Sequence, residues 1–218
     1  QITQMAWCRV KHLSFQSWKS ALISGLGLCL LLKTNSWMVM SIAGILTISS
    51  KFIFRSKRKH LFNPTNFGIM ALVLTGEAWI SPGQWGQGET GVFLILLGAS
   101  GILLRVKRWD VSAAFLMVLF ILEGAYVVGF LGWEWDVLIH RFSSGTILLF
   151  AFFMITDPKT SPDSRRGRLI WGALVALLSF FLSRFFYLYE SPLIALFIIS
   201  LTTPLIDRLY QARRFQWT

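Results

Sequence analysis

The chain has 218 residues, of which 55% are hydrophobic and 15% aromatic, and its mean hydropathy is +0.60. This composition is too apolar for an ordinary soluble domain and indicates a membrane protein. A formal net charge of +11 would suggest nucleic-acid binding in a soluble protein, but membrane topology accounts for these charges and leaves no basic stripe with interleaved aromatic residues. We therefore exclude nucleic acid as a partner and expect a lipid bilayer.

Apolar stretches recur along the chain, and each has close to the ~20 residues that a helix needs to cross a hydrocarbon core of about 30 Å. They predict an all-α polytopic membrane protein of about eight transmembrane helices. A cytoplasmic N-terminal segment over 1–16, a transmembrane helical domain over 17–210 and a cytoplasmic tail over 211–218 follow from their positions. The predicted spans lie near residues 17–34, 36–54, 66–80, 90–107, 110–131, 136–156, 167–187 and 191–210.

Most of the 21 lysines and arginines fall at every second gap between these stretches. Basic loops are retained on the cytoplasmic side during insertion, so the pattern predicts a multi-pass protein of the bacterial inner (cytoplasmic) membrane with both termini in the cytoplasm. The aspartates on the basic side lie close to cations that can offset their charge. They are Asp110, Asp157, Asp163 and Asp207.

Two carboxylates, Glu77 and Glu123, fall inside predicted spans. A charge at bilayer depth costs at least a few kcal/mol unless it is paired, which makes both residues candidates for an ion path. Arg141 and Arg184 are the obvious partners. For Glu123, a structural ion pair or a protonated carboxyl is an equally good interpretation. The third span, which contains Glu77, is short and predicts a short or broken helix.

The sequence has no recognisable catalytic constellation of a hydrolase or a phosphate-binding loop, and no metal-ligand cluster. Polar patches with glycine or proline instead occur near helix ends, at residues 60–66, 86–91, 143–146 and 156–162. Helix capping explains any one of them. However, Ser143, Ser144 and Thr146 fall inside a predicted span, where hydroxyls need partners. Backbone N–H groups at interrupted helix starts suit a phosphate or the pyrimidine edge of an isoalloxazine.

At these patches the sequence resembles the RnfD membrane subunit of Rnf electron-transport complexes and the related B-type subunit of the sodium-pumping NADH:quinone oxidoreductase. The resemblance extends over most of the chain, and the motifs that carry it occur in the order of that family. They are Phe62-Asn63-Pro64, Gly88-Glu89-Thr90-Gly91, Ser143-Ser144-Gly145-Thr146 running into Thr156-Asp157-Pro158, and Pro204-Leu205-Ile206-Asp207.

The resemblance implies a channel-type helical bundle that holds a flavin and passes electrons across the bilayer as one subunit of a larger membrane complex. It also implies coupling to the movement of Na⁺ or H⁺. We expect a non-covalent flavin, riboflavin or FMN, and no side chain that acts as a general acid or base. The residues to which the resemblance and the polar patches assign cofactor binding are Asn63, Thr65, Asn66, Gly88, Glu89, Thr90, Ser143, Ser144, Thr146, Thr156 and Asp157.

Two departures separate the chain from that family. Members with covalent flavin carry a Ser-Gly-Ala-Thr motif, whereas the corresponding loop here, residues 81–87, contains no threonine. Ser200 also stands where the family implies an Asn, and the eight predicted spans fall short of the roughly ten that the family implies. The family has further hydrophobic sequence before the part that corresponds to Leu22, so we expect that N-terminal helices are missing from a chain that begins with Gln1. Short stand-alone relatives share the Trp-x-Ser-Pro-Gly-Gln-Trp-Gly pattern of residues 79–86.

Two alternatives to a flavin-carrying redox subunit stay open on the sequence. In one, the polar patches line a solute path in a channel or transporter-like protein. In the other, the protein is a structural membrane partner that serves assembly and carries no cofactor.

Overall fold

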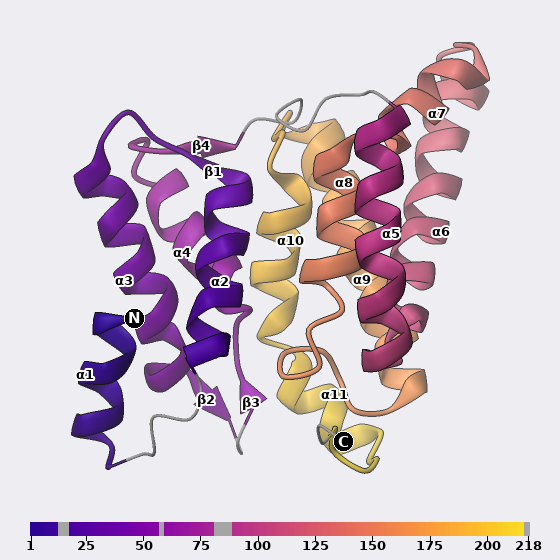
Figure 1. Cartoon of the computed structure of the whole chain (residues 1–218). Helices are drawn as coiled ribbons and strands as arrows, with labels where there is room; N and C mark the ends of the chain where they lie inside the picture. Colours follow the sequence, from indigo (N-terminus) through magenta and orange to yellow (C-terminus); the bar gives the residue numbers. More distant parts are fainter. Residues whose placement is uncertain (13–17, 57–58, 81–88, 216–218) are drawn as a thin grey trace. The chain divides into compact units, whose positions relative to one another are not determined.

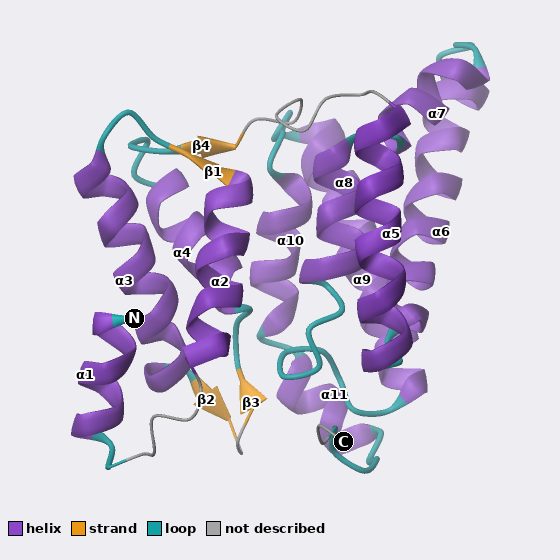
Figure 2. Ribbon diagram, viewed as in Figure 1, coloured by secondary structure: helices purple, strands orange, loops and turns teal. Residues whose placement is uncertain are grey.

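The computed structural model describes residues 1–12, 18–56, 59–80 and 89–215, and helices predominate in it (Figures 1 and 2). The chain divides into two compact units, Gln1–Ser81 and Pro82–Thr218. The units are defined by contacts within the chain and not by position in a membrane. The predicted boundaries at residues 16 and 210 between cytoplasmic and transmembrane parts therefore stay predictions. Each unit is described by itself.

The first unit is a small helical bundle with two short strand pairs. Its third helix packs against the fourth, the second helix contacts both, and the first lies against the third. The all-α prediction lacked the strand pairs, in which β1 pairs antiparallel with β4 and β2 with β3 (Figure 2). The elements are α1 (Ile2–Val10), α2 (Trp18–Leu31), β1 (Leu32–Lys33), α3 (Trp37–Ile53), β2 (Arg55–Ser56), β3 (Lys59–His60), α4 (Pro64–Val73) and β4 (Trp79–Ile80).

The predicted N-terminal segment contains a helix, α1, that packs on α3. Trp7 stacks on Phe52 with ring centroids 5.6 Å apart, and its indole N–H donates to Ser49 Oγ over 3.0 Å. These contacts attach α1 to the first unit.

Helix α4 is shorter than the predicted span over 66–80. It begins after Asn63, whose side chain accepts the N–H of Asn66 (3.1 Å), and Pro64 suits the first turn because that position needs no N–H donor. It ends at Val73, and Gly76 follows with φ of +77°, a left-handed conformation that glycine adopts at little cost. The short helix predicted for the third span is therefore confirmed, and the part of that span after Val73 is not helical.

Close packing of α3 and α4 depends on Gly68. A Cβ at this position would lie 1.8 Å from Thr47 Oγ1 and 2.9 Å from the Ala43 carbonyl oxygen. We expect Gly68→Ala to lower the free energy of unfolding by about 1–3 kcal/mol through overpacking, measured by thermal unfolding in detergent. Gly44→Ala is the matched control, because nothing lies within 4 Å of its new Cβ and alanine favours helix. Equal stability of the two variants would contradict the prediction.

In the second unit, α5, α6, α8, α9 and α10 run roughly side by side along one direction (Figure 1). Helix α9 packs against α6 and α10, and α5 packs against α8. Helices α6 and α8 each continue into a π-helical segment, a form often found at functional sites. The elements are α5 (Glu89–Val106), α6 (Trp109–Gly124), η1 (Ala125–Phe130), α7 (Trp135–Phe142), α8 (Gly145–Leu149), η2 (Phe150–Met154), α9 (Arg165–Phe185), α10 (Ser191–Ser200) and α11 (Thr203–Leu209).

The core of this unit lies between α6 and α9. Gly172 lets the helices approach so closely that a Cβ there would stand 2.9 Å from the Val111 carbonyl oxygen. Phe115, Trp171 and Val175 are fully buried around this contact. This closely packed pair of helices carries Asp110, Glu123, Arg168 and Arg184.

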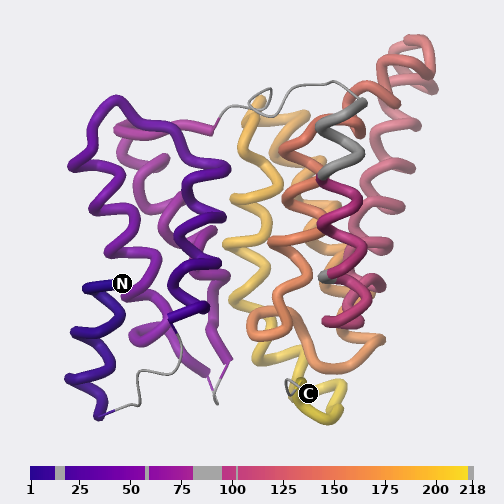
Figure 3. Tube along the Cα trace, in the orientation of Figure 1, coloured from indigo at the N-terminus to yellow at the C-terminus, as the bar shows by residue number. Residues whose placement is uncertain are grey.

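Among the residues that the structure describes, two helices are long and apolar enough to cross a membrane, Trp109–Phe130 and Arg165–Phe185. Two bent pairs would raise the number to four. The pair α7 and α8 bends by 52° and the pair α10 and α11 by 53°, and the second bend can be followed in Figure 3. Shorter apolar segments occupy the other predicted positions: α2, α3, α4 and the Ile95–Val106 part of α5. The eight predicted spans are therefore not confirmed, because about 20 residues are needed to cross the hydrocarbon core.

Candidate functional site

The predicted polar patch inside the sixth span coincides with the break between α7 and α8. Ser143 follows the last residue of α7, and its hydroxyl donates to the Ile139 carbonyl (2.9 Å). Ser144 is the N-cap of α8, but its side chain makes no capping hydrogen bond. Thr146 is the second residue of α8. The patch thus lies at the break between two helices, with Ser144 at the N-cap and Thr146 in the first turn of the second.

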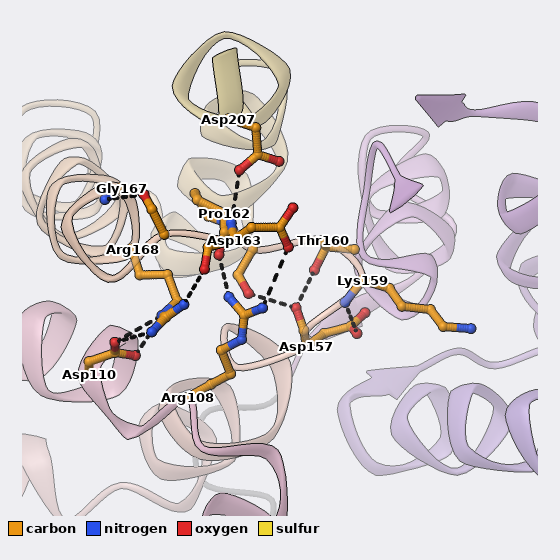
Figure 4. A network of polar contacts seen from close by, with 12 residues as sticks. Arg108, Asp110, Asp157, Lys159, Thr160, Pro162, Asp163, Gly167, Arg168 and Asp207 are labelled. Atoms are coloured by element: carbon orange, nitrogen blue, oxygen red, sulfur yellow. Dashed lines mark hydrogen bonds and ion pairs between the residues drawn. The ribbon is translucent and has the colours of Figure 1, made fainter. Parts of the chain in front are cut away.

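Thr156 and Asp157 lie just after η2, in a loop that is closed by its own hydrogen bonds. Thr156 Oγ1 donates to the Phe152 carbonyl (2.7 Å). The Asp157 carboxylate accepts the Lys159 N–H (3.0 Å), and the Asp157 carbonyl accepts the hydroxyls of Thr160 (3.2 Å) and Ser161 (2.9 Å), as Figure 4 shows. These polar groups stabilise the loop itself.

A charged network fastens this loop to α6, α9 and α11 (Figure 4). Arg108 donates to the Pro162 carbonyl and lies 3.6 Å from the carboxylate of Asp163. The Asp163 N–H donates to Asp207 over 2.8 Å, and its carbonyl accepts from Arg168 over 2.6 Å. Arg168 also forms a bidentate pair with Asp110, with contacts of 2.6–2.9 Å. The predicted offset of basic-side aspartates by cations is confirmed for Asp110 and Asp163.

Arg108 is the most buried cation of this network, with 3% of its surface exposed. Burial lowers the pKa of its guanidinium, and the neighbouring Arg168 lowers it further, while Asp163, Asp110 and Asp207 oppose the shift. The aspartates therefore keep the charged form of Arg108 at the loop. Sequence reasoning noted the aspartates but not Arg108 and Arg168 as their partners, because pairs 55 or more residues apart have no local signal in the sequence.

The predicted cofactor-binding residues of the first unit are Asn63, Thr65 and Asn66. In the described contacts they cap a helix or join two helices. Asn63 caps α4, and Thr65 Oγ1 donates to the Ser24 carbonyl of α2 (3.2 Å). Asn66 is fully buried. These residues belong to a different compact unit from Ser143, Thr156 and the rest.

The remaining predicted cofactor-binding residues, Gly88, Glu89 and Thr90, are consecutive in the chain at the start of α5. Gly88 lies outside the described residues, as does the loop over 81–87 that lacks the covalent-flavin threonine. Glu89 and Thr90 are the first two residues of α5. Their roles stay predictions.

The second unit does not bring its two described polar patches to one point. Ser143, Ser144 and Thr146 stand at the beginning of the α8–η2 segment, whereas Thr156 and Asp157 follow its end. Ten helical residues separate the patches by about 15 Å. A single ring system in contact with both patches is therefore not supported by this arrangement.

The two glutamates predicted inside spans have different surroundings. Glu77 is exposed in the turn after α4 and therefore does not lie within a helix as predicted. Glu123 on α6 is fully buried and contacts both predicted partners. Its Oε1 lies 3.0 Å from Arg141 on α7, and its Oε2 contacts Arg184 on α9. Both oxygens face arginines, which favours a structural ion pair over an ion path.

Apolar helices of spanning length and a buried charge cluster between them define the class of the molecule, a helical membrane protein. The sequence profile of the NQR2, RnfD, RnfE family matches residues 77–216, and the chain belongs to this family. The match contains every motif that carried the resemblance except Phe62-Asn63-Pro64, which lies before it.

Individual relatives agree with this assignment. The chain is 35% identical over 153 residues to the D subunit of the ion-translocating oxidoreductase complex of Shewanella sediminis, an overlap that covers 68% of this chain and 42% of the relative. It is 34% identical over 156 residues to the protein of the same name from Stutzerimonas stutzeri, covering 66% and 42%. The chain thus spans about two fifths of the length of the curated relatives it matches.

Proposed function

We propose that this protein is a membrane subunit of an Rnf-type ion-translocating electron-transport complex. The observation that carries the proposal is the family match over residues 77–216, which includes the whole described part of the second unit. Relatives with the name of such a subunit support it. Other membrane subunits of the complex would then be its partners.

We further propose that the protein holds a non-covalent flavin, riboflavin or FMN, at the break between α7 and α8. Ser143, Ser144 and Thr146 would hold it. Two considerations support this location: the Ser143-Ser144-Gly145-Thr146 motif lies within the residues that the family profile matches, and it stands at a break between two helices, where backbone N–H groups favour anionic or strongly accepting groups. Thr156 and Asp157 hold their own loop, so they fit a flavin less well. The flavin would supply electron transfer, and the hydroxyls would orient it.

An absorption spectrum of the purified protein tests this proposal. We expect flavin bands that appear in the supernatant after denaturation and that fall at least tenfold in a Ser144→Ala, Thr146→Val double variant. Ser100→Ala is the matched control, because Ser100 lies on α5 of the same unit and its hydroxyl donates only to its own helix, at Leu97 (2.7 Å). A colourless preparation that takes up no added riboflavin or FMN would refute the flavin proposal.

The most specific part of the proposed function is coupling of electron transfer to the movement of Na⁺ or H⁺. The names of the relatives, which describe an ion-translocating complex, support it. The paired state of Glu123 and the exposure of Glu77 give no contact-based support for an ion path through either residue. Ion uptake into proteoliposomes that hold the assembled complex would test the coupling.

A structural subunit without cofactor is the second candidate. The local hydrogen bonds of Thr65, Ser143 and Thr156 favour it, since each hydroxyl already has a partner within its unit. This candidate predicts that the double variant above assembles normally and that the parent protein carries no flavin. The contacts give no comparable support to a solute path.

A further inference from the structure

The cluster of Glu123, Arg141 and Arg184 carries one more positive than negative charge. Glu123 is fully buried, whereas 35% of the Arg141 side chain and 19% of the Arg184 side chain are exposed. A charge without a counterion is costly at membrane depth. One carboxylate cannot neutralise two guanidinium groups, so the cluster can accept an additional anion.

The arginines also keep donors that the protein does not use. A guanidinium has five N–H donors. Arg141 forms an ion pair with Glu123 and donates to Ser183 Oγ (3.1 Å). Arg184 contacts Glu123, and its Cζ lies 4.6 Å from the centroid of the Tyr126 ring. The Nε of Arg184 is buried without a hydrogen-bond partner. This Nε is not accessible from outside, so the exposed parts of Arg141 and Arg184 have to supply the donors for a further anion.

The position of the cluster fits the interface between lipid tails and head groups. Glu123 lies seven residues before Phe130, the end of the α6–η1 span, which is about 10 Å along a helix. Arg184 is next to the last residue of α9. Long arginine side chains near a helix end reach towards head groups. Exposed aromatic residues, which favour the head-group region, surround this end of the second unit: Trp133, Trp135, Phe185, Phe186, Tyr187 and Tyr189.

The acidic residues nearest in sequence do not neutralise the cluster in the described contacts. Asp136, on the first turn of α7, is exposed and accepts the N–H of Val137 (2.7 Å). Glu134 is the exposed N-cap of the same helix. Both precede Arg141 by more than one helical turn. Glu190, six residues after Arg184, is the N-cap of α10 and forms no ion pair with either arginine in the described contacts. The counterion for the surplus charge is therefore expected from outside the chain.

We propose that Arg141 and Arg184 bind the phosphate group of a membrane phospholipid. A phosphodiester carries one negative charge, which balances the cluster, and its oxygens match the paired N–H donors of a guanidinium. The lipid anchors that phosphate at the depth to which the arginines reach. The proposal does not depend on the flavin or on electron transfer.

Titration calorimetry on the purified full chain in a non-ionic detergent tests the site. The probes are dihexanoyl phosphatidylglycerol, dihexanoylglycerol, which has no phosphate, and inorganic phosphate. We expect phosphatidylglycerol to bind at one site per chain and at least tenfold more tightly than either of the others. Equally tight binding of dihexanoylglycerol would overturn the role of phosphate. Equally tight binding of inorganic phosphate would overturn the lipid assignment.

A charge-neutralising variant then locates the site. Arg141→Gln leaves the Glu123–Arg184 pair intact and removes the surplus charge, so phosphatidylglycerol affinity should fall at least tenfold. Arg165→Gln, in the first turn of α9 and far from Arg184 along that helix, should bind like the parent. Salt provides a test that needs no variant: raising NaCl from 50 to 500 mM should weaken binding to the parent several-fold. Binding that is insensitive to salt or unchanged in Arg141→Gln would overturn the proposal.

Discussion

Replacing Glu123 by alanine should destabilise the second unit more than any other single substitution of an acidic residue. The carboxylate is fully buried and contacts two arginines on two other helices. Its loss leaves Arg141 and Arg184 close together without an opposite charge. Removing one partner of a buried ion pair lowers the stability of a protein by about 3–5 kcal/mol. Here a single substitution leaves two arginines without their counterion.

Thermal unfolding in detergent, followed by circular dichroism, measures this effect. Glu134→Ala is the matched control, because Glu134 is an exposed glutamate beside α7 and its removal should leave the midpoint within a few degrees of the parent. Glu123→Gln, which keeps the shape and one acceptor oxygen, should fall between the two. A Glu123→Ala protein as stable as the Glu134→Ala control would show that the cluster does not hold α6, α7 and α9 together.

Asp110→Ala should cause the second-largest loss of stability. Asp110 lies at the end of α6 opposite to Glu123. Its carboxylate accepts Nε–H and Nη–H donors of Arg168 in a bidentate pair, and both side chains are largely buried, with 5% and 12% exposed. The variant leaves Arg168 with only the Asp163 carbonyl as a described acceptor. We expect a loss of about 3–5 kcal/mol, because an uncompensated charge remains in a buried position.

The double variant Asp110→Ala, Arg168→Ala separates charge from packing. Because no unpaired charge remains in it, it should recover part of the stability that Asp110→Ala loses. Asp136→Ala, on the exposed first turn of α7, is the control for removal of an acidic residue. If Asp110→Ala alone unfolds at the midpoint of that control, the Arg168 pair does not stabilise the contact between α6 and α9.

The loop over 155–164 shows how motifs far apart in the sequence become one structure. Thr156-Asp157-Pro158 and Pro204-Leu205-Ile206-Asp207 are separate signals in the sequence. In the fold, Asp207 accepts the N–H of Asp163, and a Cβ added at Gly167 would lie 2.8 Å from Ile206. The two motifs therefore shape a single end of the second unit, which neither predicts alone.

The sequence by itself determined the helical membrane class, the positions of most helices and the family, because these follow from hydrophobic length, helix-breaking residues and local motifs. It also indicated that Arg141 and Arg184 pair with Glu123. It could not determine that α4 ends at Val73, that Glu77 is exposed or that the polar patches of α8–η2 stand at opposite ends of one segment. Helix ends and the partners of buried charges depend on contacts between residues far apart in the chain, so only the tertiary structure decided them.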